Sequence, residues 1–417
     1  MELKKYRLGE ILELQRGYDL PSSQQKAGNV LVAGSNGIIG YHNEIRGNHP
    51  CITVGRSGSV GKVHYYEQPT WAHNTALFVK DFKGNNPQYL YYFLKNLHLD
   101  EMFVKGSSVV PSLDRKVVHS LVVPFHKEVV CQKRIALVLS NIDRKIELNR
   151  AINQNLEAMA KQLYDYWFVQ FDFPNENGRP YKSFGGKMVW NEKQRKYIPE
   201  YWEVKSLSNW LEIKSGFPFK SETYKPIGRY KIITIKNVQD GELVTSGCDY
   251  VNDIPSRAKD YISLQIGDRL ISLTGNCGRL CVVCEENLLL NQRVGLLCCD
   301  AIYLEYFYNF LNSGTMRTVI DNLANGAAQA NLSPVELCKT DCFIPPIDIL
   351  LSYNRKVNAI RKAIVQNNQE ISQLAKQRDE LLPLLMNGQV SVNSDLSVYK
   401  KRRGKVPSSI QNDVSDI

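Results

Sequence analysis

The sequence predicts an α+β fold in which two similar globular domains are separated by two long helices. Three observations predict it. The chain of 417 residues is long enough for two or three domains, short motifs recur in the same order in both halves, and each half closes with a long stretch of heptad spacing. We expect the helices to pair as an antiparallel coiled coil with an internal pseudo-twofold repeat, because such a pair carries two similar domains at its opposite ends.

The globular parts of the two halves share a series of short motifs. The segment LGEILELQRG opens the chain and aligns with LSNWLEIKSG, which opens the second half. Further on, YLYYFL matches YLEYFY, and LVVPF and CFIPPI each end a globular part on proline. VGRSGSVGKV aligns with ISLTGNCGRL, which pairs Gly58 with Gly275, Gly61 with Gly278 and Lys62 with Arg279.

Both long helices carry a seam in which apolar residues and asparagines step by four and three. Asn149 and Asn367 occupy equivalent seam positions, where a buried polar residue fixes register or partner choice. The alternative is that each helix packs only on its own domain. The seam residues are Ile142, Ile146, Asn149, Leu156 and Leu163 in the first helix, and Ile360, Ile364, Asn367, Leu374 and Leu381 in the second.

These patterns divide the chain into six segments. Residues 1–125 form a first globular domain, 126–170 a first long helix, 171–200 a linker rich in Gly, Pro, Asn and charge, 201–346 a second globular domain, 347–388 a second long helix, and 389–417 a disordered basic tail. A helix over residues 131–168 is a rod of roughly 57 Å at about 1.5 Å per residue. Two domains so mounted would reach DNA grooves a turn or more apart.

Composition favours a cytoplasmic protein with a polyanionic partner. The net charge is +10, and it is spread along the chain, which favours nucleic acid. The sequence shows no leader and no apolar run long enough for a membrane span. The ten cysteines are set mostly among apolar residues without nearby histidines, so we expect reduced, buried thiols and no metal site.

No catalytic motif is recognisable. VGRSGSVGKVHYY resembles a phosphate-binding loop, but Arg56 replaces the first glycine and Val63 the hydroxyl residue, so a hairpin turn is predicted instead. Methyltransferase, nuclease and hydrolase motifs are also missing. We therefore expect no active site. The competing classes are a self-contained nuclease or methyltransferase with a divergent site, and a coiled-coil scaffold that binds only protein.

Glycine-rich turns in both halves carry amide, hydroxyl and cationic side chains of the kinds that read DNA. Arginine pairs with guanine and Asn or Gln with adenine, whereas lysine and hydroxyls mostly hold phosphates. Ordinary turn chemistry is the alternative for each residue alone. The candidate DNA-binding residues are Ser35, Asn36, Arg56, Ser57, Ser59, Lys62, Asn74, Lys105 and Ser107 in the first half, and Lys236, Asn237, Thr274, Asn276, Arg279, Gln292 and Arg293 in the second.

Several features together are similar to one known family. They are GSNGIIGYHN, the segment FDFPNENGRPYKSFGGKMVWNEKQRKYIPEYWEV after the first helix, the repeat of globular part plus long helix, and LLPLLMNGQV at the end of the second helix. Over nearly its whole length the chain resembles the specificity (S) subunit of type I restriction-modification systems. The tail after Gln389 matches no family motif. Specificity subunits of some two-subunit type II systems share this architecture and remain an alternative.

The resemblance implies a role for each part. The globular halves would be target-recognition domains, each reading one part of a bipartite site in double-stranded DNA. The helices would set the spacing and dock two methyltransferase (M) subunits, and restriction (R) subunits would complete the complex. S-adenosylmethionine, ATP and Mg would serve those partner subunits, so the family implies no cofactor and no catalytic residue in this chain.

Overall fold

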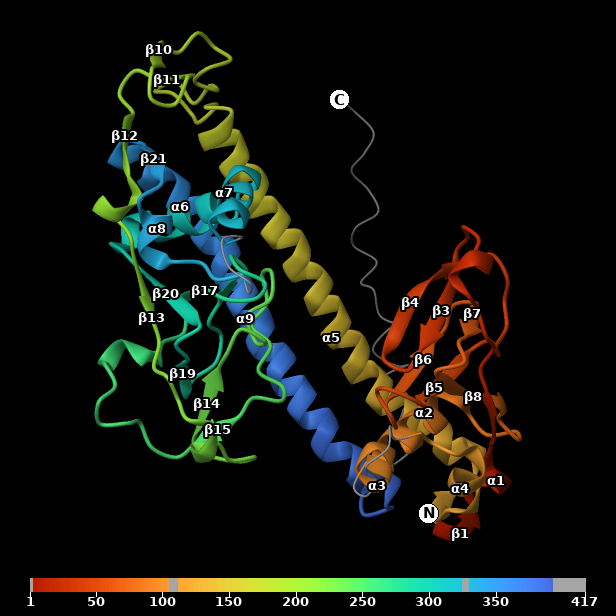
Figure 1. Ribbon diagram of the computed structural model, residues 1–417. Helices are drawn as coiled ribbons and strands as arrows, with labels where there is room; N and C mark the ends of the chain where they lie inside the picture. The colour runs from red at the N-terminus through yellow and green to blue at the C-terminus, as the bar shows by residue number, and fades with distance from the viewer. Residues whose placement is uncertain (1–2, 105–111, 325–329, 393–417) are drawn as a thin grey trace, which may run out of the picture. The chain divides into compact units, whose positions relative to one another are not determined.

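The computed structural model describes residues 3–104, 112–324 and 330–392 (Figure 1). The chain divides into two compact units. Unit 1 comprises Met1–Lys145 with Leu374–Ile417, and unit 2 comprises Ile146–Gln373. Two of the predicted DNA-binding residues, Lys105 and Ser107, and the predicted disordered tail from residue 393 onward lie outside the described residues.

The described part of unit 1 is built from two small sheets, one strand pair and four short helices on the first part of a long helix. One sheet has the antiparallel order β2-β8-β5-β6, and the other has the order β4-β3-β7, in which β3 and β7 are parallel. The elements are β1 (Leu3–Arg7), α1 (Leu8–Ile11), β2 (Glu13–Arg16), β3 (Val30–Gly34), β4 (Gly37–His42), β5 (Cys51–Gly55), β6 (Val63–Tyr66), β7 (Thr70–Ala72), β8 (Ala76–Asp81), α2 (Pro87–Asn96), α3 (Leu99–Val104), α4 (Arg115–Ser120), β9 (Val122–His126) and α5 (Val129–Tyr164).

The core of unit 1 follows from its apolar pattern. Every residue of β5 is buried, as expected of a strand covered on both faces. Helix α2 begins where the Asn86 side chain accepts a hydrogen bond from the Tyr89 amide and Pro87 takes the first position. The buried face of α2 packs against β5, β8 and the start of α5 in one apolar cluster.

Unit 2 has the same kinds of parts. Its sheets have the orders β13-β20-β17-β18 and β15-β14-β19-β16, and β12 pairs with β21. The elements are β10 (Met188–Asn191), β11 (Lys196–Pro199), β12 (Glu203–Ser206), β13 (Glu212–Ser215), β14 (Tyr230–Ile233), β15 (Tyr250–Val251), β16 (Ser263–Leu264), β17 (Arg269–Ser272), β18 (Leu280–Val282), β19 (Leu288–Leu290), β20 (Val294–Cys298), α6 (Ala301–Leu311), α7 (Gly314–Ala324), α8 (Pro334–Cys338), β21 (Asp341–Ile344) and α9 (Ile347–Met386).

The two units repeat one topology, which confirms the predicted α+β fold with an internal repeat. The antiparallel sheet of unit 1 corresponds strand for strand to β13-β20-β17-β18 of unit 2. In the second sheet, the parallel pair of β3 and β7 corresponds to the parallel pair of β14 and β19. The strand pair β1 and β9 likewise corresponds to β12 and β21.

The long helices pair in an antiparallel sense within each unit. In unit 1, Arg378 Nη1 of α9 lies 2.9 Å from Asp143 Oδ1 of α5. In unit 2, Asn149 of α5 donates to Glu370 of α9 at 2.8 Å, and Glu157 pairs with Arg361. Partner numbers on α9 fall as those on α5 rise, which is the antiparallel sense that the heptad spacing predicted.

The predicted seam residues line this helix pair, and none of them is fully exposed. Asn149 and Asn367 do not bond each other: Asn367 instead donates to Asn153 at 2.9 Å, and Asn153 donates to Asn368 at 2.8 Å. Ile146, Asn149 and Ile364 are buried, and Ile142, Leu156, Leu163, Ile360, Asn367, Leu374 and Leu381 are half-buried.

The segment predicted as a linker, residues 171–200, is part of unit 2 and packs into its core. Helix α5 ends in a single π-helical turn, Asp165–Val169, and the chain then forms the β10–β11 hairpin. Phe171 and Phe173 are buried with Trp202 in the main core of unit 2. Asp172 accepts hydrogen bonds from the amide and hydroxyl of Ser183 at 2.7 and 2.6 Å. Aromatic residues within the polar segment explain why it is ordered.

Within the described ranges, none of the helices combines the length and the apolar character that a bilayer crossing requires.

Candidate nucleic-acid interface

The loop between β5 and β6 of unit 1 is a tight turn fixed by its glycines. The amide of Gly55 donates to Lys62 O at 2.8 Å, and the amide of Gly61 donates to Gly55 O at 2.9 Å. Gly58 and Gly61 both have φ of +80°. A Cβ on Gly61 would lie 2.2 Å from the Asp100 backbone nitrogen, so the loop can approach α3 this closely only with glycine there.

Two neighbouring turns join this loop. The Lys62 Nζ donates to Asn36 Oδ1 at 2.8 Å, which ties the loop to the β3–β4 turn. The amide of Ser35 lies 3.2 Å from Thr75 Oγ1, and the amide of Arg56 donates to Thr75 O at 2.9 Å. The structure therefore brings together seven predicted residues: Ser35, Asn36, Arg56, Ser57, Ser59, Lys62 and Asn74.

An open groove of about 820 Å³ lies beside these turns. It is lined by residues 15–19, by Arg56 and Leu77, and by residues 112–115. Arg16 and Arg115 place two cations in this groove, and neither is among the predicted DNA-binding residues. Arg16 stands immediately before Gly17 in the repeated opening segment, which is a usable signal, whereas no sequence signal marks Arg115.

The β17–β18 loop of unit 2 repeats the turn with other side chains. Gly275 and Gly278 have φ of +71° and +78°, so the predicted correspondence with Gly58 and Gly61 holds in backbone geometry. Thr274 is half-buried and Asn276 is exposed. Arg279 donates to the side-chain oxygen of Gln239, in the loop that follows β14.

A second set of predicted residues lines one pocket of unit 2. The pocket has a volume of about 360 Å³ and includes Lys236, Gln292 and Arg293, all of which are exposed, together with Asn237. The prediction for Asn237 does not fit the structure. Its amide is buried, accepts from the amide and hydroxyl of Thr234, and donates to Val244 O and Cys248 Sγ, so it shapes a turn and has no group left for a base.

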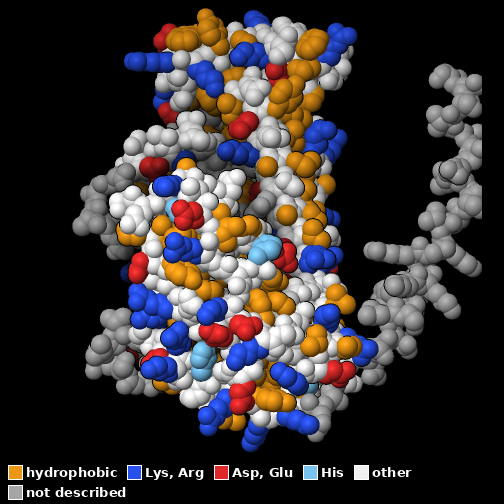
Figure 2. All heavy atoms as spheres, turned by 90° about the vertical axis from the view of Figure 1, so that its right-hand side faces the viewer, with side chains coloured by type: hydrophobic (Ala, Val, Ile, Leu, Met, Phe, Trp, Pro, Cys, Tyr) orange, Lys and Arg blue, Asp and Glu red, His pale blue; other side chains and the backbone are white. Residues whose placement is uncertain are grey.

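Side chains of both charges are mixed on the face of the molecule drawn in Figure 2. Basic, acidic and hydrophobic side chains alternate there without a broad basic patch. Close to the unit 1 loops, burial and then the charge of Lys62 lower the pKa of His64, and burial lowers the pKa of His73. Both rings are therefore neutral near pH 7, and the positive charge at these loops comes from lysine and arginine.

The turns of unit 1 described above all lie within residues 1–158. These residues match the family described as type I restriction modification DNA specificity domain. The chain is similar to type I specificity subunits. Two relatives extend the likeness beyond the matched domain. The MjaIX specificity subunit of Methanocaldococcus jannaschii is 27% identical over 317 residues, covering 73% of this chain and 69% of the relative. The HindI specificity subunit of Haemophilus influenzae is 24% identical over 309 residues, covering 62% and 67%.

A solved structure shares the fold of this chain. The type I restriction-modification S subunit from M. genitalium superposes with a TM-score of 0.55 at 16% identity, covering 92% of this chain and 96% of that one. Because the likeness spans nearly the whole of both chains, it includes both globular domains and both long helices.

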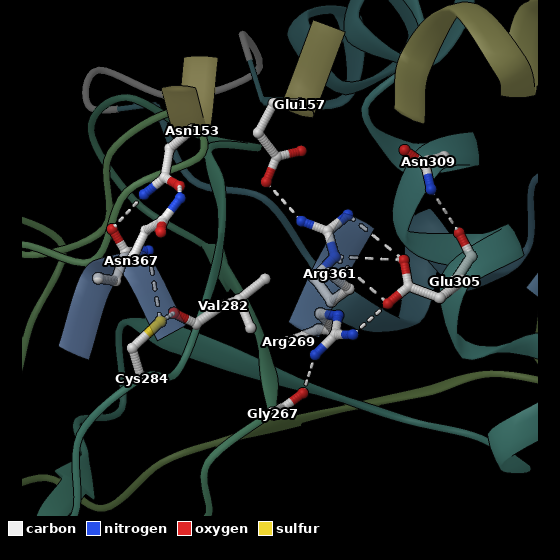
Figure 3. Close-up of polar contacts among 11 residues, drawn as sticks. Asn153, Glu157, Gly267, Arg269, Val282, Cys284, Glu305, Asn309, Arg361 and Asn367 are labelled. Atoms are coloured by element: carbon white, nitrogen blue, oxygen red, sulfur yellow. Dashed lines mark hydrogen bonds and ion pairs between the residues drawn. The ribbon is translucent and has the colours of Figure 1, made fainter. Parts of the chain in front are cut away.

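A group of charges holds the second domain on the long helices of unit 2 (Figure 3). Arg361 of α9 contacts both carboxylate oxygens of Glu305 on α6 at 3.3 to 3.4 Å and also pairs with Glu157 of α5. Arg269 of β17 pairs with the same carboxylate of Glu305. Burial alone would raise the pKa of Glu305, but Arg361 and Arg269 reverse the effect, and the pKa is lowered.

The first domain is joined to the helices by other residues. The hydroxyl of Tyr92 on α2 donates to Asp143 of α5, which also accepts from Arg378 of α9. The position of Glu305 in YLEYFY corresponds to Tyr91 in YLYYFL. The chain therefore repeats the sheets and turns in its two halves, but not the polar contacts that attach them to the long helices.

The cysteines of the chain include several buried thiols, among them Cys51, Cys281 and Cys284. Burial raises the pKa of Cys51 to about 12 and that of Cys284 to about 11, so these thiols stay protonated. Among the residues that the structure describes, no group of three or more His, Cys, Asp or Glu side chains has metal-binding geometry.

Proposed function

We propose that this chain is the DNA-sequence-specificity subunit of a type I restriction-modification complex, and that each globular domain reads one part of a bipartite target. The observation that carries the proposal is the repeated turn. Gly58 and Gly61 keep the backbone geometry of Gly275 and Gly278, whereas the side chains between them differ. One scaffold with two sets of side chains suits two different DNA sequences.

The proposal gives the long helices a spacing and docking role. The antiparallel pairing of α5 and α9 supports it, as do the solvent-exposed apolar residues Leu148, Ile152 and Met159 on α5. In this proposal the helix pair docks two methyltransferase subunits, and restriction subunits join the same complex. The chain itself supplies no catalytic group and binds no cofactor, and S-adenosylmethionine, ATP and Mg are used by the partner subunits.

Experiments can distinguish this proposal from two alternatives. A specificity subunit of a two-subunit type II system would read DNA in the same way but would copurify with a different catalytic subunit. A self-contained nuclease or methyltransferase would act alone. Incubating the purified chain with DNA, Mg²⁺ and labelled S-adenosylmethionine tests the second, because cleavage or methyl transfer by this chain alone would contradict the proposal.

The positive test is to map the target. Modified bases in the genome that encodes this chain are located by single-molecule sequencing, and the motif found is then used in footprinting with the purified chain or its complex. We expect two protected segments separated by an unread gap. A single protected segment, or binding without sequence preference, would overturn the proposal.

A further inference from the structure

A pocket of about 340 Å³ lies in unit 2, between the segment that follows α5 and the start of α9. Its walls are largely aromatic. The ring of Phe173 stacks on Tyr181 and on Trp202, with 4.7 and 5.5 Å between the ring centroids. The hydroxyl of Tyr181 donates to Lys187 O at 2.9 Å, and three prolines also line the pocket. Stacked rings and prolines therefore keep open a space that is large enough for one side chain.

The charged residues of this pocket are acidic. Glu176 and Asp348 line it, both are exposed, and none of the described residues that line it is Lys, Arg or His. Within the described part of the chain, neither carboxylate takes part in a hydrogen bond or an ion pair. In a chain with a net charge of +10, such a pocket attracts a cation and repels DNA phosphates.

An exposed aromatic ring lines the same pocket. Tyr201 is 77% exposed, whereas the adjacent Trp202 is 6% exposed. A cation over the face of such a ring is stabilised by the charge distribution of the ring. A guanidinium suits a ring beside carboxylates better than an ammonium does, because it is planar, stacks on the ring and bonds a carboxylate through two N–H groups. The pocket therefore has the chemistry of an arginine site.

The segment that forms much of the pocket has the composition of a protein interface. Four of the six aromatic residues that are exposed in the described part of the chain lie between residues 184 and 201. Aromatic residues and arginine are both enriched in protein interfaces. The four residues are Phe184, Trp190, Tyr197 and Tyr201. These observations favour an arginine that is carried by a protein over a free cation.

We infer that this pocket binds an arginine side chain of a protein partner. The apolar stem of the arginine packs on the aromatic wall, and its guanidinium contacts the Tyr201 ring and the carboxylates of Glu176 and Asp348. The inference goes beyond the proposed function, because it concerns which protein surface the chain binds and not which DNA bases it reads. The charge of the pocket is opposite to that of the turns predicted to bind DNA, so the two sites select different partners.

The first experiment tests the pocket with a small probe. N-acetylarginine amide is titrated into the full chain, and tryptophan fluorescence reports binding because Trp202 lines the pocket. N-acetylcitrulline amide is the control ligand, since it has nearly the same shape without the charge. We expect saturable binding that is about tenfold tighter for the arginine amide, and the variant Glu176→Gln with Asp348→Asn should remove this preference. Glu192→Gln neutralises an exposed carboxylate of the same segment outside the pocket and should keep the preference.

The second experiment tests whether the arginine belongs to a protein. The affinity of the chain for each protein subunit with which it copurifies is measured by surface plasmon resonance. The double variant should bind one of these subunits about tenfold more weakly while its affinity for DNA stays unchanged. Tyr201→Ala should cause a similar loss without a change in charge, and its melting temperature should equal that of the unaltered chain because the side chain is exposed. Glu192→Gln should bind every subunit as the unaltered chain does.

Equal binding of the two amides, or an arginine preference that persists in the double variant, would overturn the inference. Unchanged affinity of the double variant and of Tyr201→Ala for every copurifying subunit would overturn it as well, because the pocket would then serve a free cation. Loss of DNA affinity in place of subunit affinity would assign these side chains to DNA binding, with the same result.

Discussion

The ammonium of Lys62 lies 2.8 Å from the side-chain oxygen of Asn36, and this bond joins the glycine loop to the turn after β3. Arg279 makes the equivalent bond to Gln239 in the second domain. A cation after the second glycine thus reaches an amide oxygen in the neighbouring turn in both units. We expect these two cations to hold DNA phosphates, because a flexible charge beside a turn positions a protein without reading bases.

Replacing Lys62 by alanine should weaken binding to all DNA sequences by similar factors. Each lost phosphate contact lowers the slope of log affinity against log salt by about 1. The measurement is a salt titration of DNA affinity with target and non-target duplexes. Lys376→Ala on α9 is the control, since it removes the same charge from a side chain that is 78% exposed. An unchanged salt slope in Lys62→Ala would contradict the phosphate assignment.

Arg56 borders the groove of the first domain, and the contact of its guanidinium within the described residues is a long one of 3.5 Å to Asn74 O. We expect Arg56→Ala to relax recognition at one half-site by about 1 to 3 kcal/mol if the side chain pairs with a guanine. Affinities for duplexes with single base changes in each half-site give the result. Arg293→Ala should affect the other half-site, and an unchanged preference in Arg56→Ala would remove this residue from the readers.

Removing Arg361 should destabilise unit 2 strongly. Its loss leaves Glu157 and part of Glu305 as buried uncompensated carboxylates, which costs about 3 to 5 kcal/mol in the free energy of unfolding. Urea denaturation of Arg361→Met measures the cost, and adding Glu157→Gln should restore part of the stability. Lys339→Met, which breaks an exposed pair with Glu336, should cost less than about 1 kcal/mol. Equal costs at the two sites would contradict a stabilising role for the buried network.

The acid sensitivity of unit 2 should depend on Glu285. Burial raises the pKa of this carboxyl, but hydrogen bonds from Lys231, Thr245 and Ser372 and the charge of Lys231 outweigh it, and the pKa falls below its ordinary value of 4.5. A lowered folded-state pKa contributes stability that is present above the ordinary value and is lost as the pH falls through the folded value.

The experiment compares urea unfolding of the unaltered chain and of Glu285→Gln as a function of pH. The difference in unfolding free energy should be constant at neutral pH and should shrink below about pH 4.5. The control is Glu336→Gln, whose carboxylate is 53% exposed. A difference for Glu285→Gln that stays constant down to about pH 3 would contradict the assignment.

The sequence predicted those features that depend on local spacing. The heptad steps of α5 and α9 and the glycine pairs of the two hairpin loops are readable because each is set by residues close together in the chain. The parallel pairing of β3 with β7 could not be predicted in this way, because the two strands are joined through β4, β5 and β6 and neither has a pattern that selects its partner.

The polar sites were harder to predict for two physical reasons. Asn237 has the residue type and the turn context of a residue that reads bases, but the same amide can equally well form hydrogen bonds within its own turn. Because Asn237 is buried, it makes the bonds within the turn. Arg361 and Glu305 were missed because they lie far apart in the sequence and meet only when α9 packs against α6. The predicted role of the remaining turn residues in DNA binding stays a prediction.

The fit of Gly61 against Asp100 bears on how this protein could acquire new targets. Because the backbone of the loop is set by its glycines and by that close contact, residues 56, 57 and 59 can be exchanged without moving the main chain. Natural variation or a laboratory library at these positions should then change which DNA is bound while the protein keeps its stability. Diversity at Gly61 itself should yield only unfolded chains.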